Sequence, residues 1–188
     1  ILRVPDKVYL EGYWQSERYF ADIGDVVRRE FTVRHPLADR NLQMAKMIAD
    51  TESVSVHVRR GDYVSDPAIA RIHGVCSLEY YGRCIALIAE IVGGPHFYIF
   101  SDDPEWALEN LRPNHPCTYV THNDAVHGYE DLRLMSICEH NIIANSSFSW
   151  WGAWLNANPE KIVLAPQKWF KDPSVDTRDL LPAGWIRL

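Results

Sequence analysis

The stretch VSVHVRRGDY at residues 54–63 joins an apolar strand to a charged turn. Its first residues carry apolar side chains on alternate positions, which is typical of a β-strand. Arg59 and Arg60 follow at once, in a chain whose net charge is −6. Because a guanidinium group binds phosphate oxygens through two parallel hydrogen bonds and keeps its charge, the pair indicates an anion site. Gly61 would let the backbone approach a ligand closely, and Asp62 could hold one guanidinium in place. The alternative is a surface ion pair between Arg60 and Asp62.

Strands and helices alternate on the carboxyl side of this stretch. Ser77 is placed to cap one helix, and Asp103 with Pro104 to start another. Short apolar strands separated by helices predict an α/β fold, a Rossmann-like parallel sheet with helices on both faces. Ligands of such sheets bind at the carboxyl ends of the strands, so residues that follow a strand are site candidates. Further strands are expected at residues 96–100, 117–120, 141–144 and 161–165, and helices at 78–92, from 104 onward, at 130–138 and at 148–156.

Residues 1–50 are expected to form an amino-terminal remnant that leads into a sheet domain at residues 51–188. A short strand is expected at residues 7–13, then a helix capped by Ser16 that runs to about Glu30, then a helix at 41–49. The chain begins at Ile1 without a methionine, so we expect it to be a piece of a longer protein.

Composition excludes several classes of protein. A hydrophobic fraction of 47% argues against disorder, and a net charge of −6 argues against broad nucleic-acid binding. The four cysteines form no C-x-x-C pair, so a zinc site is not expected and reduced thiols are. No apolar run is long enough to cross a bilayer. We expect a cytoplasmic location, with peripheral contact with a membrane as the alternative.

Two acidic residues, Asp102 and Asp103, follow the second strand of the predicted sheet. Paired carboxylates at this position could hold Mg²⁺ or Mn²⁺ with a diphosphate. The favoured alternative is that Asp103 caps the helix opened by Pro104 while Asp102 accepts hydrogen bonds from a ribose or a base. No metal is therefore expected.

A serine-rich turn, NSSFS at residues 145–149, follows the fourth strand and opens a helix. Free backbone N–H groups and hydroxyls at a helix start bind anions, and Ser146 or Ser147 could also act as an N-cap. Trp150, Trp151 and Trp154 on that helix are expected to be core. The chain lacks the glycine-rich motifs of dinucleotide oxidoreductases and P-loop enzymes and the serine elbow of hydrolases. An arginine-based diphosphate site on a Rossmann-like sheet remains.

The segment HVRRGDY at residues 57–63 resembles the H-x-R-R-x-D motif shared by α-1,2-, α-1,6- and protein O-fucosyltransferases. Three further segments resemble the α-1,2 family, glycosyltransferase family eleven, in particular. They are EGYWQSERYF at 11–20, HGVCSLEYY at 73–81 and NSSFSWWGAWL at 145–155. Their order and spacing match over nearly the whole chain, including Trp169, Phe170 and Trp185.

The resemblance implies the donor-binding half of a GT-B glycosyltransferase, which transfers fucose from GDP-β-L-fucose with inversion and without a metal or other cofactor. In that picture Arg59 contacts the diphosphate, Asp102 lies at the nucleoside, and Asp131 accepts hydrogen bonds from guanine. His57 is structural, with its backbone facing the base. The expected donor-binding residues are His57, Arg59, Arg60, Ser101, Asp102, Asp131, Asn145, Ser146, Ser147 and the Phe148 amide.

The implied reaction is attack of a galactose 2-hydroxyl on the fucose anomeric carbon, with Arg59, aided by Arg60, stabilising the departing GDP. Asp62 is the first candidate for the general base, with Asp66 and His73 as the others. The expected partners are GDP-fucose, a galactose-terminated glycan and the missing amino-terminal domain, since the family's opening G-G-L-G-N-Q-M-F-Q segment is absent here. The alternatives are another GDP-sugar transferase, of the α-1,6 or protein O-type, and a non-catalytic nucleotide- or carbohydrate-binding module.

Overall fold

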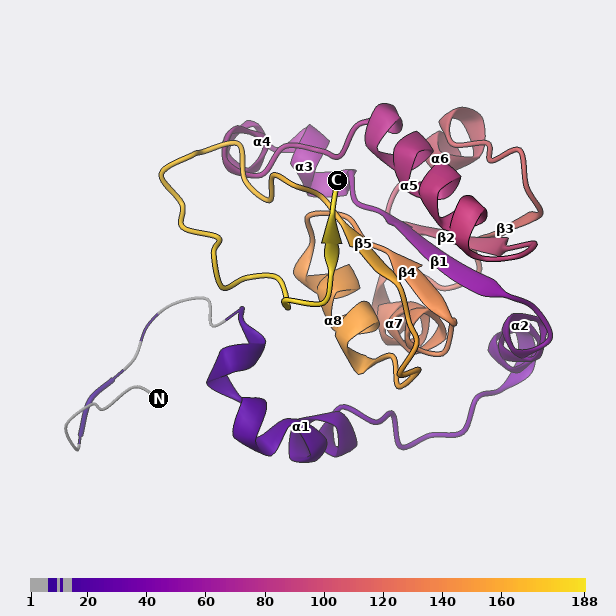
Figure 1. Ribbon diagram of the computed structural model, residues 1–188, viewed down its shortest axis with the longest axis horizontal. Coiled ribbons are helices and arrows are strands. Elements are labelled where there is room, and N and C mark those ends of the chain that lie inside the picture. The colour runs from indigo at the N-terminus through magenta and orange to yellow at the C-terminus, as the bar shows by residue number, and fades with distance from the viewer. Residues whose placement is uncertain (1–6, 10, 12–14) are drawn as a thin grey trace.

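A sheet of six parallel strands lies at the centre of the molecule in the computed structural model, which describes residues 7–9, 11 and 15–188 (Figure 1). Its strand order, β3-β2-β1-β4-β5-β6, is that of a doubly wound Rossmann sheet. The predicted α/β fold is confirmed, and all five expected strands are present. The strands are β1 (Ser53–Val58), β2 (His96–Ser101), β3 (Cys117–Val120), β4 (His140–Ile142), β5 (Val163–Ala165) and β6 (Ile186–Arg187).

Strand β1 is buried on both faces, although its sequence alternates between apolar and polar residues. The valines Val54, Val56 and Val58 pack in one core cluster with helix α5 (Leu78–Ile91). On the other face the polar residue Ser55 accepts a hydrogen bond from Asn141 Nδ2 at 2.7 Å. A central strand can therefore carry polar residues when a neighbouring strand satisfies them.

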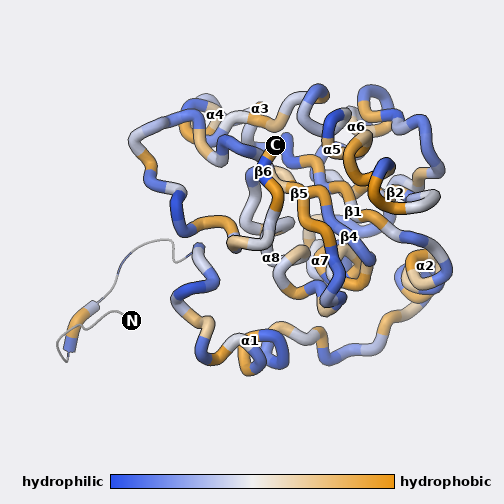
Figure 2. The backbone as a smooth tube through the Cα atoms, viewed as in Figure 1, coloured by the Kyte–Doolittle hydropathy of each residue, from blue (hydrophilic) through white to orange (hydrophobic). Residues whose placement is uncertain are grey.

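Helices cover both faces of the sheet (Figure 1). Helices α5 and α6 (Pro104–Asn110) pack on one face against β1 and β2. Helices α2 (Asp39–Ala49), α7 (Gly128–Ser136) and α8 (Ser147–Leu155) cover the other. Figure 2 shows β2 and β5 as largely hydrophobic traces inside more hydrophilic outer segments. Within the described residues, no helix has both the length and the apolar character needed to span a membrane.

Four expected caps are confirmed, those of Ser16, Ser77, Asp103 and Ser146. The Ser77 side chain accepts a hydrogen bond from Tyr80 N at the start of α5. The Asp103 side chain accepts one from Trp106 N at the start of α6, next to Pro104 in the first turn.

The amino-terminal segment differs from prediction. The expected helix from Ser16 to Glu30 is broken into η1 (Glu17–Tyr19), η2 (Ala21–Ile23) and α1 (Gly24–Glu30), because Phe20 turns away from helical angles. The Phe20 ring packs at 5.0 Å from that of Trp154, so tertiary contact overrides local helix propensity. The strand expected at residues 7–13 lies partly outside the described residues, and residues 7–9 and 11 are irregular. Short elements that the sequence analysis did not predict are α3 (Gly61–Ser65), α4 (Pro67–Ile72), η3 (Ala125–His127) and β6.

Candidate functional site

The candidate site lies where the strand order reverses, between the carboxyl ends of β1 and β4. Open α/β sheets bind ligands at this switch point, because the loops that leave the two strands diverge to opposite faces. A cavity of about 510 Å³ opens here. Its lining comes from the β1–α3 turn, α4 and the start of α8: Arg59, Asp62, Tyr63, Ala68, Ile69, Ile72, His73, Ser146, Ser147 and Phe148.

The register of β1 and β2 brings the arginine pair beside the aspartate pair. The last paired residues of these strands are Val58 and Ser101. The two residues that follow on each strand therefore come side by side, and Arg59 meets Asp102 while Arg60 meets Asp103.

Arg59 is held between two carboxylates. Its Nη2 lies 2.7 Å from Asp62 Oδ1, and its Nη1 lies 3.1 Å from Asp102 Oδ2. Its Nε is buried and has no hydrogen-bond partner. The guanidinium also lies 5.4 Å from the Tyr63 ring. The side chain is thus fixed in place at the cavity wall.

Gly61 allows the Asp102 carboxylate to approach the β1–α3 turn. A Cβ atom on Gly61 would lie 2.5 Å from Asp102 Oδ2, and Asp102 Oδ1 accepts a hydrogen bond from Arg60 N at 2.8 Å. Gly61 was expected to let a ligand approach the backbone, and in the structure it lets the Asp102 side chain approach instead. Both Asp102 oxygens contact protein groups, and its role at the nucleoside stays a prediction.

Arg60 points toward α6 and away from the cavity. Its Nε lies 3.2 Å from Asp103 Oδ2, and its guanidinium lies 3.8 Å from the Trp106 ring. The alternative ion pair between Arg60 and Asp62 is wrong, because Asp62 pairs with Arg59.

The two serines of the β4–α8 turn have different environments. Ser146 is buried, and its Oγ accepts from Phe148 N at 3.3 Å, so Ser146 is the N-cap. Ser147 is exposed at the cavity. The Phe148 amide, expected to bind phosphate, is engaged by the cap. The helix behind this turn is anchored in the core by Trp150, of which 1% is exposed.

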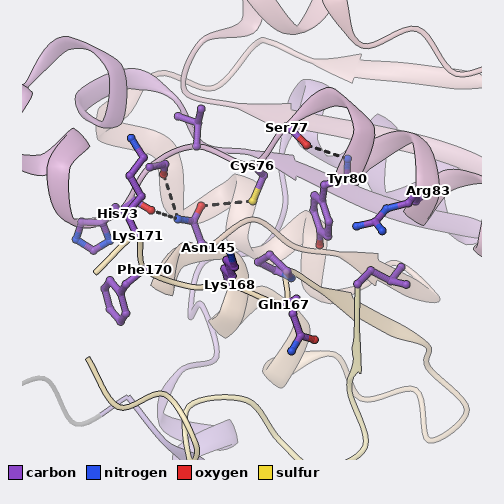
Figure 3. Close-up of a pocket in the computed structure, with 14 residues that line it drawn as sticks. His73, Cys76, Ser77, Tyr80, Arg83, Asn145, Gln167, Lys168, Phe170 and Lys171 are labelled. Carbon is purple, nitrogen blue, oxygen red and sulfur yellow. Dashed lines mark hydrogen bonds between the residues drawn. The ribbon is translucent and has the colours of Figure 1, made fainter. Parts of the chain in front are cut away.

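The Asn145 side chain joins three loops through hydrogen bonds. Its Nδ2 donates to the carbonyl oxygens of His73, Gly74 and Trp169 at 3.0–3.1 Å, and its Oδ1 accepts from Cys76 Sγ at 3.5 Å. Figure 3 shows the contacts with His73, Gly74 and Cys76 at the wall of a neighbouring cavity of about 470 Å³. The side chain is therefore used within the protein, and Asn145 positions the Ser146–Ser147 turn.

His57 is a buried residue beneath the site. Its ring lies 5.5 Å from that of Phe148, and its Nδ1 has no hydrogen-bond partner. Burial, aided by the nearby Arg59 charge, lowers the pKa of His57 to about 3, so the ring is neutral. Its carbonyl oxygen accepts from Tyr81 Oη at 3.1 Å, which agrees with the structural role expected for it.

A second polar cluster lies at the carboxyl end of β3, two strands and so about 10 Å from β1. Asp131 on α7 accepts from Asn123 Nδ2 at 2.7 Å. Asn41 on α2 contacts both Asn123 and His122. Burial raises the pKa of Asp131 to about 6. Sequence analysis found Asp131 but missed Asn41, His122 and Asn123, although the last two follow a predicted strand.

The paired acids after β2 diverge. Asp102 turns toward Arg59, and Asp103 caps α6. Ser101 accepts from Asp103 N at 3.0 Å and stabilises this turn. Among the described residues, no group of three or more His, Cys, Asp or Glu side chains is arranged to hold a metal ion. Metal independence stays a prediction.

Comparison with known proteins agrees with this architecture. Residues 2–188 match the sequence model of the family described as Glycosyl transferase family 11. The chain is 38% identical over 183 residues to an Alpha-1,2-colitosyltransferase of Escherichia coli, with 94% of this chain and 61% of the relative covered. It is 37% identical to the Escherichia coli O-antigen biosynthesis glycosyltransferase WbnK, with 100% and 63% covered. It is 30% identical to the Rattus norvegicus Galactoside alpha-(1,2)-fucosyltransferase 1, with 83% and 43% covered. The chain thus spans under two thirds of the length of these relatives.

Proposed function

The chain belongs to glycosyl transferase family 11, and from that membership we propose that it is the part of a glycosyltransferase that binds a GDP-sugar. The complete protein would transfer L-fucose from GDP-fucose to the 2-hydroxyl of a terminal β-galactoside. Transfer would proceed with inversion and without a metal ion.

The observation that carries this proposal is the cavity between Arg59 and Ser147 at the switch point. A diphosphate entering this cavity would replace Asp62, whose side chain is 40% exposed, while Asp102 keeps the guanidinium in position. The hydroxyl of Ser147 and the start of α8 would bind the phosphate from the opposite wall. Arg59 would then stabilise the charge that develops on the leaving GDP.

The cluster around Asp131 supports guanine as the base. A carboxylate can accept hydrogen bonds from guanine N1–H and N2–H₂ together, and adenine does not present that pair of donors. Asn123 holds the carboxylate in place, at 2.7 Å. The nucleotide would lie across the carboxyl ends of β4, β1 and β2 and reach β3 with its base.

Colitose is the second candidate for the transferred sugar, because one relative of 38% identity is named an α-1,2-colitosyltransferase. Colitose is L-fucose without the 3-hydroxyl. The two donors therefore differ by one hydrogen-bonding group, which none of the residues assigned above to phosphate or guanine would contact.

A donor competition on the complete protein tests the function. We expect transfer from GDP-fucose, or from GDP-colitose, to a β-galactoside such as lactose, and activity that survives EDTA. Comparable use of UDP- or ADP-sugars would contradict the guanine site. Binding of galactoside with no requirement for nucleotide, and no transfer, would favour a non-catalytic module instead.

A further inference from the structure

A second cavity, of about 750 Å³, lies beside the donor cavity. The two cavities share Tyr63, Ile72, His73 and Ser147 as a common wall. Flat aromatic rings with a polar rim are suited to a sugar, whose C–H face is apolar and whose hydroxyls need partners. The lining of the second cavity beyond the shared wall has this composition: Gln15, Ser16, Tyr19, Trp169, Phe170, Val175, Asp176, Asp179 and Leu180.

His73 stands in the wall between the two cavities. Its ring is stacked at 4.8 Å on that of Tyr63 and lies 5.1 Å from that of Phe170. Its carbonyl oxygen is held by Asn145, and in Figure 3 the ring is directed away from Asn145. Its Nδ1 is buried without a partner, so Nε2 is the ring nitrogen that a ligand would have to reach. Among the described lining residues, His73 is the one imidazole that both cavities share.

Four carboxylates near the two cavities are less suited to act as the base. Asp176 and Asp179 line the second cavity but are paired with Arg178 and Arg18. Asp62 lines the donor cavity beside Arg59 and does not line the second cavity, so even when a diphosphate displaces it from Arg59 it lies on the side of the departing GDP. Inversion requires the acceptor and its base on the opposite side of the anomeric carbon. Asp66 is engaged as the N-cap of α4, where Oδ1 accepts from Ala68 N at 2.8 Å.

We propose that the acceptor sugar lies in the second cavity and that His73 is the base that takes the proton from its reacting hydroxyl. This inference rests on the proposed transferase function. The hydroxyl proton moves to His73 Nε2 as the hydroxyl oxygen bonds to the anomeric carbon of the donor. The bond from that carbon to the phosphate oxygen breaks, and its electron pair leaves with GDP beside Arg59.

The protonation state of His73 is compatible with this role. Burial lowers the pKa of His73, Asp62 raises it, and Arg59 lowers it. The segment after β5 adds Lys168 and Lys171 in one adjoining cavity, and Asp176 and Asp179 in the other. The net effect of burial, Asp62 and Arg59 is a lowered pKa, so the imidazole is neutral at pH 7 and can accept a proton.

His73→Phe in the complete protein tests the proposal, because phenylalanine can keep the stacking on Tyr63 but cannot accept a proton. We expect kcat for transfer to fall by about 10²–10⁴-fold, the usual contribution of a general base. The Kd for GDP should change little. The acid limb of the pH profile of kcat, measured at saturating donor so that the ionisation of Asp131 does not contribute, should disappear. His35→Gln, at an exposed histidine away from both cavities, is the matched control.

A second variant, His73→Ala, tests whether His73 acts as a base or only packs as a ring. Added imidazole should restore part of its activity, and increasingly so as the pH rises and free imidazole loses its proton. A kcat for His73→Phe within tenfold of wild type, or an unchanged acid limb, would overturn the role of His73 alone. If wild-type protein that binds GDP transfers no sugar to any galactoside, the proposed function fails and the role of His73 fails with it.

Discussion

Gly61→Ala should damage the candidate site, although it adds only one methyl group, because that group would displace the Asp102 carboxylate. The new Cβ would lie 2.5 Å from Asp102 Oδ2, where ordinary contacts are 3.4–4 Å, so the carboxylate must move by about 1 Å. That movement breaks its hydrogen bond from Arg60 N, at 2.8 Å, and its contact with Arg59, at 3.1 Å.

The expected loss in the free energy of unfolding follows from these two contacts. A hydrogen bond to a charged acceptor contributes about 1.5–3 kcal/mol, and the partly exposed ion pair adds about 0–1 kcal/mol. Replacing glycine by alanine in a helix returns about 0.5–1 kcal/mol. We expect the free energy of unfolding to fall by about 0.5–3.5 kcal/mol, measured by urea denaturation, and GDP affinity to fall with it.

Gly82→Ala is the matched control. Gly82 is exposed within α5, and a Cβ atom there would meet nothing within 4 Å. The same substitution should raise the free energy of unfolding by about 0.5–1 kcal/mol. If both variants shifted stability in the same direction and by similar amounts, the contact between Gly61 and Asp102 would not be the reason that glycine is needed.

Three further predictions concern ligand binding and the core. Arg59→Lys should weaken GDP binding by about 1.5–3 kcal/mol in calorimetry, because one ammonium cannot replace a fork held by two carboxylates; unchanged affinity would exclude Arg59 from the phosphate site. GDP affinity should rise with pH through about 6 as Asp131 ionises, and Asp131→Asn should abolish the rise. Because the folded-state pKa of Asp131 is raised above its unfolded-state pKa, Asp131 stabilises the fold most at a pH below the unfolded-state pKa. This stabilisation is lost as the pH rises through about 6, so the wild type should lose stability there relative to Asp131→Asn. Ser147→Ala should cost about 1 kcal/mol of GDP binding with no change in Tm. Trp151→Ala removes an indole ring that stacks on Phe20 and Phe31, so it should lower Tm with less effect on GDP binding. The opposite pattern would make Trp151 a ligand contact.

Some features were predictable but were not predicted. Asp66 and Pro67 start α4 with the same cap-and-proline signal that correctly located α6 at Asp103 and Pro104. Helix α4 is only six residues long, which is too short for hydrophobic patterning to reveal it. Trp151, expected in the core, is only partly buried and packs at the edge of the core, where Phe20 and Phe31 of the amino-terminal segment stack on it.

The sequence by itself determined the parallel α/β fold, the strands β1 to β5 and the region of the site. Strand and helix periods are local properties, and the rule that ligands bind at the carboxyl ends of parallel strands converts them into site candidates such as Arg59 and Ser147. The tertiary structure decided which side chains contact one another. The register that pairs Val58 with Ser101 sets Arg59 against Asp102 and turns Arg60 toward Asp103. These contacts join residues more than forty positions apart, and successive side chains of a strand point to opposite faces. Only the folded sheet could therefore place one arginine in the cavity and its neighbour outside it.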